Sequence, residues 1–144
     1  AINCIHAVLP GMIEKESGAI VCISSDAGRM GEYREAVYSA CKAGVIALSK
    51  SVARETGRYG LRLNVVCPGL VVPPAEESIS EESMWNQMRD IFTDEVRERV
   101  ERNYLFRRIG TAQEVANAVV FLASDAASFI TGQTLSVSGG YTMM

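Results

Sequence analysis

The segment Ile20–Lys42, with the sequence IVCISSDAGRMGEYREAVYSACK, constrains the fold of this chain more than any other stretch. It opens with apolar residues that predict a buried strand and passes through two serines into a loop that contains two glycines. A helical pattern follows and places Tyr38 and Lys42 four residues apart. On a helix this spacing puts both side chains on one face, one turn apart. A strand followed by a loop and a helix in this manner is typical of an α/β fold.

Ser25, Tyr38 and Lys42 together are a set of groups for moving a proton. A free phenol titrates near pH ~10, so it is a poor base at neutral pH. An ammonium group ~4–5 Å away, at an effective dielectric near 20, favours the phenolate by roughly 3–4 kcal/mol. The serine hydroxyl would then hydrogen-bond the oxygen that gains or loses the proton. Taken alone, Y-x-x-x-K is more often a surface pair on a helix. The strand, the double serine and the thirteen-residue step from Ser25 to Tyr38 favour the catalytic interpretation.

The rest of the chain adds further helical and strand patterns. Apolar residues recur at helical spacing over residues 1–16 and again over residues 36–58. Residues 61–66 and 134–137 predict strands, and the first of these is dense in Leu and Val, as parallel strands are. The turn Cys67–Gly69 follows that strand directly, at the end where α/β sheets place their ligands.

Residues 74–103 differ in character, because they combine nine acidic residues with four arginines. Apolar positions within them predict two short amphipathic helices, and the simplest interpretation is a solvated helical hairpin. Further along, Thr111–Glu114 has the pattern of a capping box, which predicts that another helix begins there.

Charge and cysteine usage exclude several classes of function. The net charge is −3 and there is no basic block, which argues against nucleic-acid binding. The apolar runs are far shorter than the ~20 residues that span a bilayer. The four cysteines are widely spaced with no C-x-x-C pattern, and His6 is the one histidine, so a zinc site is not expected. Free buried thiols in a reducing cytoplasm are the simplest account.

The Ile20–Lys42 segment resembles the active-site segment of the short-chain dehydrogenase/reductase family, whose pattern is a strand, I-S-S, a glycine-containing loop and Y-x-x-x-K. Further family motifs follow in the family's order up to position 140 of the 144 residues. They are N-V-V-C-P-G at 64–69, R-I-G at 108–110, F-L-A-S-D at 121–125, I-T-G-Q at 130–133 and V-S-G-G at 137–140.

The resemblance implies an α/β fold in which this chain forms the C-terminal part of a Rossmann-like, doubly wound parallel sheet. It also implies an oxidoreductase that transfers a hydride between NAD or NADP and a secondary alcohol or ketone. Tyr38 would be the general acid/base, Lys42 would favour its phenolate and hold the ribose hydroxyls, and Ser25 would orient the substrate oxygen. The residues expected to contact the cofactor are Tyr38, Lys42, Pro68, Gly69 and Val71.

By the same resemblance, residues 74–103 form a helical lid over the substrate, with Trp85 and Met88 on its inner face. The substrate would be a small molecule, either a 3-oxoacyl thioester or an alicyclic acyl thioester. A homo-tetramer is expected when the protein is full length, with the helix over residues 36–58 at an interface. No nucleic-acid or membrane partner and no metal site are expected.

The chain lacks the glycine-rich loop with which the family binds its dinucleotide, because neither T-G-x-x-x-G-x-G nor G-x-G-x-x-G occurs. The resemblance therefore implies that residues 1–144 are a single, incomplete Rossmann-type domain without its N-terminal dinucleotide-binding half, and that the chain alone is an inactive fragment. Two positions depart from the family pattern. Pro73 stands where the family usually has threonine, and Ser138 where it commonly has aspartate.

Two other interpretations stay open. An epimerase or dehydratase acting on nucleotide sugars shares the Tyr–Lys pair, although such chains usually carry a larger C-terminal substrate domain. A non-catalytic half-domain would bind no cofactor. A serine hydrolase is disfavoured, because no G-x-S-x-G pattern occurs and His6 has no partners for a triad.

Overall fold

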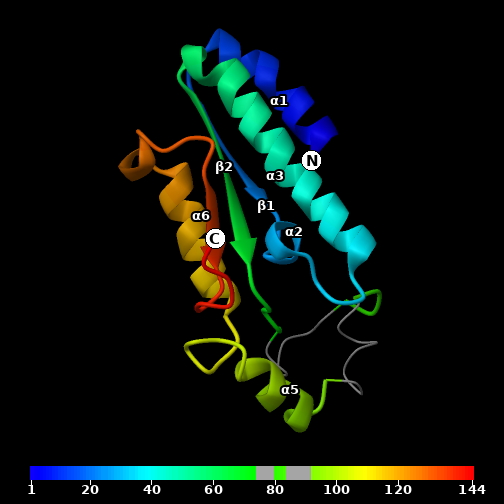
Figure 1. Ribbon diagram of the computed structural model, residues 1–144. Helices are drawn as coiled ribbons and strands as arrows, with labels where there is room; N and C mark the ends of the chain where they lie inside the picture. Colours follow the sequence, from blue (N-terminus) through cyan, green and yellow to red (C-terminus); the bar gives the residue numbers. More distant parts are fainter. Residues whose placement is uncertain (74–79, 84–91) are drawn as a thin grey trace.

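The computed structural model describes residues 1–73, 80–83 and 92–144, and their core is a three-stranded parallel sheet (Figure 1). The strands are β1 (Gly18–Ile23), β2 (Leu61–Pro68) and β3 (Thr134–Val137), in the spatial order β1-β2-β3. Gly18 pairs with Leu61 at the start of β1. All three strands point the same way, so their carboxyl ends meet at one edge of the sheet. The α/β class and the parallel sheet predicted from the sequence are confirmed.

Helices cover both faces of the sheet (Figure 1). On one face, α1 (Ile2–Glu14) and α3 (Ala36–Thr56) lie side by side. Their contacts with the sheet form a cluster of four buried residues: Ile5, Val52, Ala53 and Leu63. On the other face lies α6 (Ala112–Ala123), which together with the 3-10 turn η2 (Asp125–Ala127) buries Val66 and Leu122. The result is a helix–sheet–helix sandwich.

β2 is the most buried element, which explains why its sequence is almost continuously apolar. Leu63, Val65 and Val66 are at most 1% exposed. The one amide in the strand, Asn64, is equally buried but fully used: its side chain donates to Ile130 O at 2.8 Å and accepts from Gln133 N at 3.0 Å. This polar pair joins the middle of the sheet to the segment that leads into β3.

The helix termini follow the sequence signals. Thr111 and Glu114 form a complete capping box at the start of α6, as predicted. Helix α3 ends at Thr56 and continues as the 3-10 turn η1 (Gly57–Tyr59), so the predicted span of 36–58 is close to the observed one. A short helix, α2 (Ala27–Met30), occupies part of the segment that the sequence analysis interpreted as a loop. Helix α5 (Asp94–Glu101) belongs to the predicted lid insert, and Thr93 caps it.

The prediction that the thiols are buried is wrong for two of the four cysteines. Cys4 and Cys41 are exposed, Cys22 is partly buried and Cys67 is fully buried. Cys4 and Cys41 lie on surfaces of α1 and α3 that the described residues leave uncovered. Burial raises the pKa of the Cys67 thiol.

The described parts of the chain lack two features that mark other functional classes. None of their helices combines the length and the apolar character needed to cross a bilayer. They also contain no group of three or more His, Cys, Asp or Glu side chains placed to hold a metal ion.

Candidate active site

A cavity of about 860 Å³ opens at the carboxyl ends of β1 and β2. Ser25 and Tyr38 line it, together with the whole turn from Pro68 to Val71. Lys42 lies one turn of α3 beyond Tyr38, against its ring. The structure therefore brings together Ser25, Tyr38, Pro68, Gly69 and Val71 around one space, with Lys42 behind the tyrosine. Trp85 and Met88 lie outside the described residues.

The position of Ser25 follows from how β1 ends. Ser24 N–H still donates to Val66 O at 2.8 Å, so the backbone stays paired with β2 up to the residue before Ser25. The Ser24 side chain turns to the helix side and donates to Lys42 O at 2.8 Å. Ser25 then lies at the start of the next turn, where its hydroxyl oxygen accepts from Ala27 N–H at 3.2 Å. The first serine is thus a structural link, and the second one faces the cavity.

Tyr38 and Lys42 interact directly on α3. The ammonium nitrogen of Lys42 lies 5.5 Å from the centroid of the Tyr38 ring and donates to Ile23 O, at the end of β1, at 3.2 Å. Tyr38 is 47% exposed, so its hydroxyl is accessible from the cavity. The ammonium group and the phenol are therefore neighbours on one face of the helix.

Gly28 sets the distance between the serine loop and α3. A Cβ atom at this position would lie 2.7–2.8 Å from backbone atoms of Lys42 and Ala43, closer than real Cβ contacts. Only glycine therefore lets α2 pack this closely against the turn of α3 that carries Lys42. In this chain, Gly28 of the glycine-containing loop is therefore needed for the packing of α2 on α3.

The turn after β2 is held from several sides. Pro68 O accepts from Asp26 N–H at 3.1 Å, and Gly69 N–H donates to Val137 O at 3.2 Å. Leu70 N–H donates to the Tyr104 hydroxyl at 2.8 Å. Val71 forms a parallel bridge with Gly110. The backbone proposed to contact a cofactor is therefore fixed by β3 and by the segment before α6.

The cavity residues that were not predicted from the sequence include Asp26, Glu32, Tyr104 and Tyr141. The two tyrosine rings stack with their centroids 5.0 Å apart, and the Tyr141 hydroxyl donates to Glu32. Burial raises the pKa of Tyr104. The pKa of Tyr141 is also raised, first by burial and then by its bond to Glu32. The signal that could have revealed Asp26 is its position directly after Ser25.

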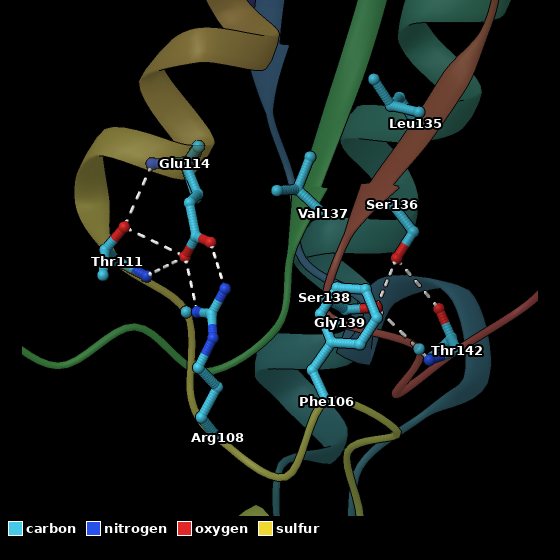
Figure 2. Close-up of a pocket in the computed structure, with 13 residues that line it drawn as sticks. Phe106, Arg108, Thr111, Glu114, Leu135, Ser136, Val137, Ser138, Gly139 and Thr142 are labelled. Atoms are coloured by element: carbon cyan, nitrogen blue, oxygen red, sulfur yellow. Dashed lines mark hydrogen bonds and ion pairs between the residues drawn. The ribbon is translucent and has the colours of Figure 1, made fainter.

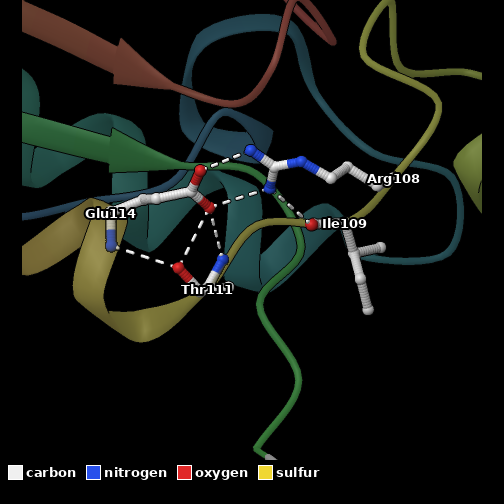
Figure 3. Close-up of polar contacts among 4 residues, drawn as sticks. All are labelled: Arg108, Ile109, Thr111 and Glu114. Carbon is white, nitrogen blue, oxygen red and sulfur yellow. Dashed lines mark hydrogen bonds and ion pairs between the residues drawn. The ribbon is translucent and has the colours of Figure 1, made fainter.

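A second, smaller cavity of about 410 Å³ lies beside β3 (Figure 2). One wall carries Arg108, whose guanidinium binds both carboxylate oxygens of Glu114 at 2.9 and 2.5 Å (Figure 3). The Arg108 guanidinium, helped by Thr111, lowers the pKa of Glu114 from its usual 4.5 to about 2. The arrangement supports the capping box and the segment that pairs with Val71.

Comparisons with known proteins agree with this geometry. The family model described as enoyl-(acyl carrier protein) reductase matches residues 1–142. The 3-oxoacyl-[acyl-carrier-protein] reductase FabG of Staphylococcus aureus (strain Mu50 / ATCC 700699) is 41% identical over 141 residues, which are 98% of this chain and 52% of the relative. The chain therefore spans about half the length of the curated relatives it matches.

Solved structures share the fold of this chain. A 3-oxoacyl-[acyl-carrier protein] reductase with bound NAD from Brucella melitensis superposes with a TM-score of 0.79 at 33% identity, covering 99% of this chain and 48% of that one. ElxO with NADP bound superposes with a TM-score of 0.82 at 30% identity, covering 96% of this chain and 52% of that one. A family match over nearly the whole chain, together with the motif residues gathered at one cavity, shows that the chain belongs to the short-chain dehydrogenase/reductase family.

Proposed function

We propose that the protein carrying this chain is an NAD(P)-dependent oxidoreductase that interconverts a secondary alcohol and a ketone. One observation supports this most strongly: Ser25 and Tyr38 face the same cavity, and Lys42 lies against the Tyr38 ring. A hydroxyl that can orient an oxygen, beside a phenol that can exchange a proton, is the donor set that carbonyl reduction needs.

In the reducing direction the described residues handle the proton. The Ser25 hydroxyl donates a hydrogen bond to the ketone oxygen and holds it facing Tyr38. The Tyr38 hydroxyl gives its proton to that oxygen as negative charge develops there, and the Lys42 ammonium stabilises the phenolate that remains. In alcohol oxidation the same groups act in reverse. A nicotinamide cofactor, when bound, supplies or takes the hydride.

The residues present fit a nicotinamide cofactor. The Lys42 ammonium donates to one backbone carbonyl among the described residues, which leaves further donors for ribose hydroxyls. The turn from Pro68 to Val71 lines the same cavity and offers its backbone. Relatives solved with NAD and with NADP leave both cofactors as candidates.

For the substrate we propose a 3-oxoacyl thioester, with an alicyclic acyl thioester as the narrower alternative. The curated relatives are 3-oxoacyl-[acyl-carrier-protein] reductases. The cavity lining also offers apolar contacts for an acyl chain, from Leu70, Val71 and Val100. The sequence pattern predicts that Trp85 and Met88 belong to the inner face of the lid, so their replacement by alanine should change the preference between short and long acyl chains.

The test uses the protein expressed from its complete reading frame and, in parallel, residues 1–144 alone. NADH and NADPH oxidation is followed with an acetoacetyl thioester as substrate. From the complete reading frame we expect turnover with one of the two cofactors and a large loss of rate in Ser25→Ala. Residues 1–144 alone are expected to be inactive. Absence of any ketone-dependent oxidation, with cofactor binding also absent, would favour the non-catalytic half-domain.

Enoyl reduction is a second candidate, because the matching family model carries that description. A crotonyl thioester, which has a carbon–carbon double bond in place of the ketone, separates the two. Turnover of the acetoacetyl thioester without turnover of the crotonyl one supports carbonyl reduction. The opposite preference would support enoyl reduction.

We also propose that the protein is a homo-oligomer, with a tetramer as the expected form. The described residues leave one side of α3 uncovered, where Val37 is 79% exposed and Cys41, Ala47 and Ser51 are exposed as well. A long helix with small and apolar residues on its outer side is suited to packing against another copy of itself.

A further inference from the structure

We propose that Asp26 is a positioning residue: its carboxylate ties the Ser25 loop to the carboxyl end of β3 and so holds the Ser25 hydroxyl in the cavity. The inference rests on the proposed function for the role of Ser25. It concerns a residue that the family pattern of serine, tyrosine and lysine does not include.

Asp26 is anchored through both its backbone and its side chain. Its N–H donates to Pro68 O, at the end of β2, at 3.1 Å. Its Oδ2 accepts from the Ser136 hydroxyl, in β3, at 2.7 Å. The residue is 1% exposed, so both bonds are shielded from water. Two strands that are distant in sequence thus hold the residue that directly follows Ser25.

The hydroxyl groups of Ser138 and Thr142 extend the hydrogen bond between Asp26 and Ser136 into a network. The Ser136 hydroxyl has a single proton, which it donates to Asp26 Oδ2. Ser136 Oγ must then accept from Ser138 Oγ at 2.8 Å and from Thr142 Oγ1 at 3.2 Å (Figure 2). Ser138 Oγ in turn accepts from Thr142 N–H at 3.4 Å. Bonds aligned in this way polarise one another, so the carboxylate organises the whole end of β3.

The surroundings of the Asp26 carboxylate are unfavourable for the stability of the fold. Its Oδ1 atom is buried and receives no hydrogen bond from the described part of the chain. No ion pair with Asp26 occurs among those residues either. A buried carboxylate without a cation and with one unused oxygen penalises folding. This cost points to a role in the site, because an apolar side chain would stabilise the fold better.

Because Asp26 directly follows Ser25, holding Asp26 in place restrains Ser25 from its C-terminal side. Ser24, on the other side of Ser25, is held by Val66 O and Lys42 O. The Ser25 hydroxyl oxygen accepts from Ala27 N–H at 3.2 Å, so the exchange of that amide proton reports on where the hydroxyl sits. Without the carboxylate bond to Ser136, the turn loses its link to β3 and keeps the backbone bonds of Ser24 and Asp26 to β2 and its packing through α2.

The first test measures amide hydrogen exchange at Ala27 in the protein from its complete reading frame. The variants are Asp26→Ala and Ser136→Ala, which remove the same hydrogen bond from its two ends. Thr134→Val is the matched control, because its buried hydroxyl lies on the same strand and has no partner among the described residues. We expect exchange at Ala27 to be at least tenfold faster in both alanine variants and unchanged in Thr134→Val. Unchanged exchange in the alanine variants would overturn the proposal.

The second test separates positioning from general damage. We expect Asp26→Ala to lower kcat for the ketone at least tenfold, with the Kd of the cofactor within twofold of wild type. Asp26→Asn keeps an oxygen that accepts from Ser136, so it should restore most of the rate. The double variant Asp26→Ala/Ser136→Ala should be no slower than Asp26→Ala alone, since both changes break one bond.

Equal losses in Asp26→Asn and Asp26→Ala would contradict the positioning role. If Asp26→Ala does not fold, Ser136→Ala carries both tests. A wild-type protein without ketone reduction would refute the proposed function, while the exchange measurement would still decide whether Asp26 holds the Ser25 turn.

Discussion

The serine side and the tyrosine side of the cavity are built in opposite ways. Ser24, Ser25 and Asp26 sit at the buried ends of two strands and are held by hydrogen bonds to β2, β3 and α3. Tyr38 lies on the open face of α3, 47% exposed, and its hydroxyl bonds to none of the other described residues. The group proposed to hold an oxygen lies between hydrogen-bonded neighbours, and the group proposed to exchange a proton is accessible. Changes on the two sides should therefore have different signatures.

The largest effect should come from Tyr38→Phe, which removes only the hydroxyl. We expect the rate of ketone reduction to fall by ~10²–10⁴-fold, the range that general acid–base catalysis contributes. The free energy of unfolding and the cofactor Kd should stay close to wild type, because the hydroxyl forms no bond within the described chain. Rate, melting and cofactor binding are measured together in the protein from its complete reading frame.

Tyr33→Phe is the matched control, since Tyr33 lies five residues earlier and is 84% exposed. It should leave the rate unchanged. A Tyr38→Phe variant that keeps more than a tenth of the wild-type rate would remove Tyr38 from its proposed role.

The two sides meet at Gly28, and Gly28→Ala tests how closely they depend on each other. The new Cβ would lie within 2.8 Å of backbone atoms of Lys42 and Ala43, which cannot move without shifting α3. We expect a loss of ~1–3 kcal/mol in the free energy of unfolding, as for other overpacked sites. Urea unfolding followed by circular dichroism measures it.

Gly11→Ala provides the opposite control, in α1. A Cβ there meets nothing within 4 Å, so alanine should stabilise the helix by ~1 kcal/mol. If both variants changed stability by the same amount and sign, close packing of α2 on α3 would not be the reason for Gly28.

Charges placed on the outward face of α3 should change the assembly of the protein and not its folding. Glutamate at Ala47 and Ser51 places two charges on the uncovered side of the helix, where they would face their copies across an interface. We expect sedimentation to show a smaller species that keeps the circular dichroism spectrum of the wild type. Lys50→Glu, on an exposed neighbouring position, shows whether any added negative charge has this effect. An unchanged mass in the double variant would count against the interface.

The sequence predicted those features of the fold that depend on residues close together in the chain. The capping box of α6, the limits of α3 and the buried β2 follow from spacing and composition, and all are confirmed. The convergence of Ser25 with the Pro68–Val71 turn also follows, because parallel strands end at one edge. The prediction of buried cysteines failed at Cys41, since an apolar stripe on a long helix does not say which part of it the sheet covers.

The bond from Asp26 to Ser136 had no local signal. The two residues are 110 positions apart, and neither belongs to a motif with a known spacing. Their contact depends on the register of β3 against β2, where Val65 pairs with Thr134 and Cys67 with Ser136. A one-residue shift in this register would turn Ser136 to the other face of the sheet. The meeting of the proposed catalytic residues at one cavity was therefore predictable, and the contacts that support them were not.

The smallest effect is expected at the outer support of the serine side, where Arg108 and Glu114 anchor the segment that bridges to Val71. Glu114 has a pKa of about 2 in the folded protein against its usual 4.5. A lowered pKa in the folded state stabilises that state above the unfolded value, and the gain disappears as the pH falls through the folded value. The contribution of Glu114 is thus full at neutral pH and declines between about pH 4.5 and pH 2.

Glu114→Gln should therefore lower the urea midpoint slightly at pH 7, and the difference from wild type should shrink as the pH approaches 2.5. The effect is small because the pair is exposed to solvent and screened by it. Glu98→Gln, an exposed carboxylate without an ion pair in the described chain, should show no such convergence. If Glu114→Gln also left ketone reduction unchanged, the serine side would depend on its buried hydrogen bonds alone. A loss of rate together with the midpoint would show that the surface pair helps to hold the Pro68–Val71 turn, because Val71 pairs with the residue four positions before Glu114.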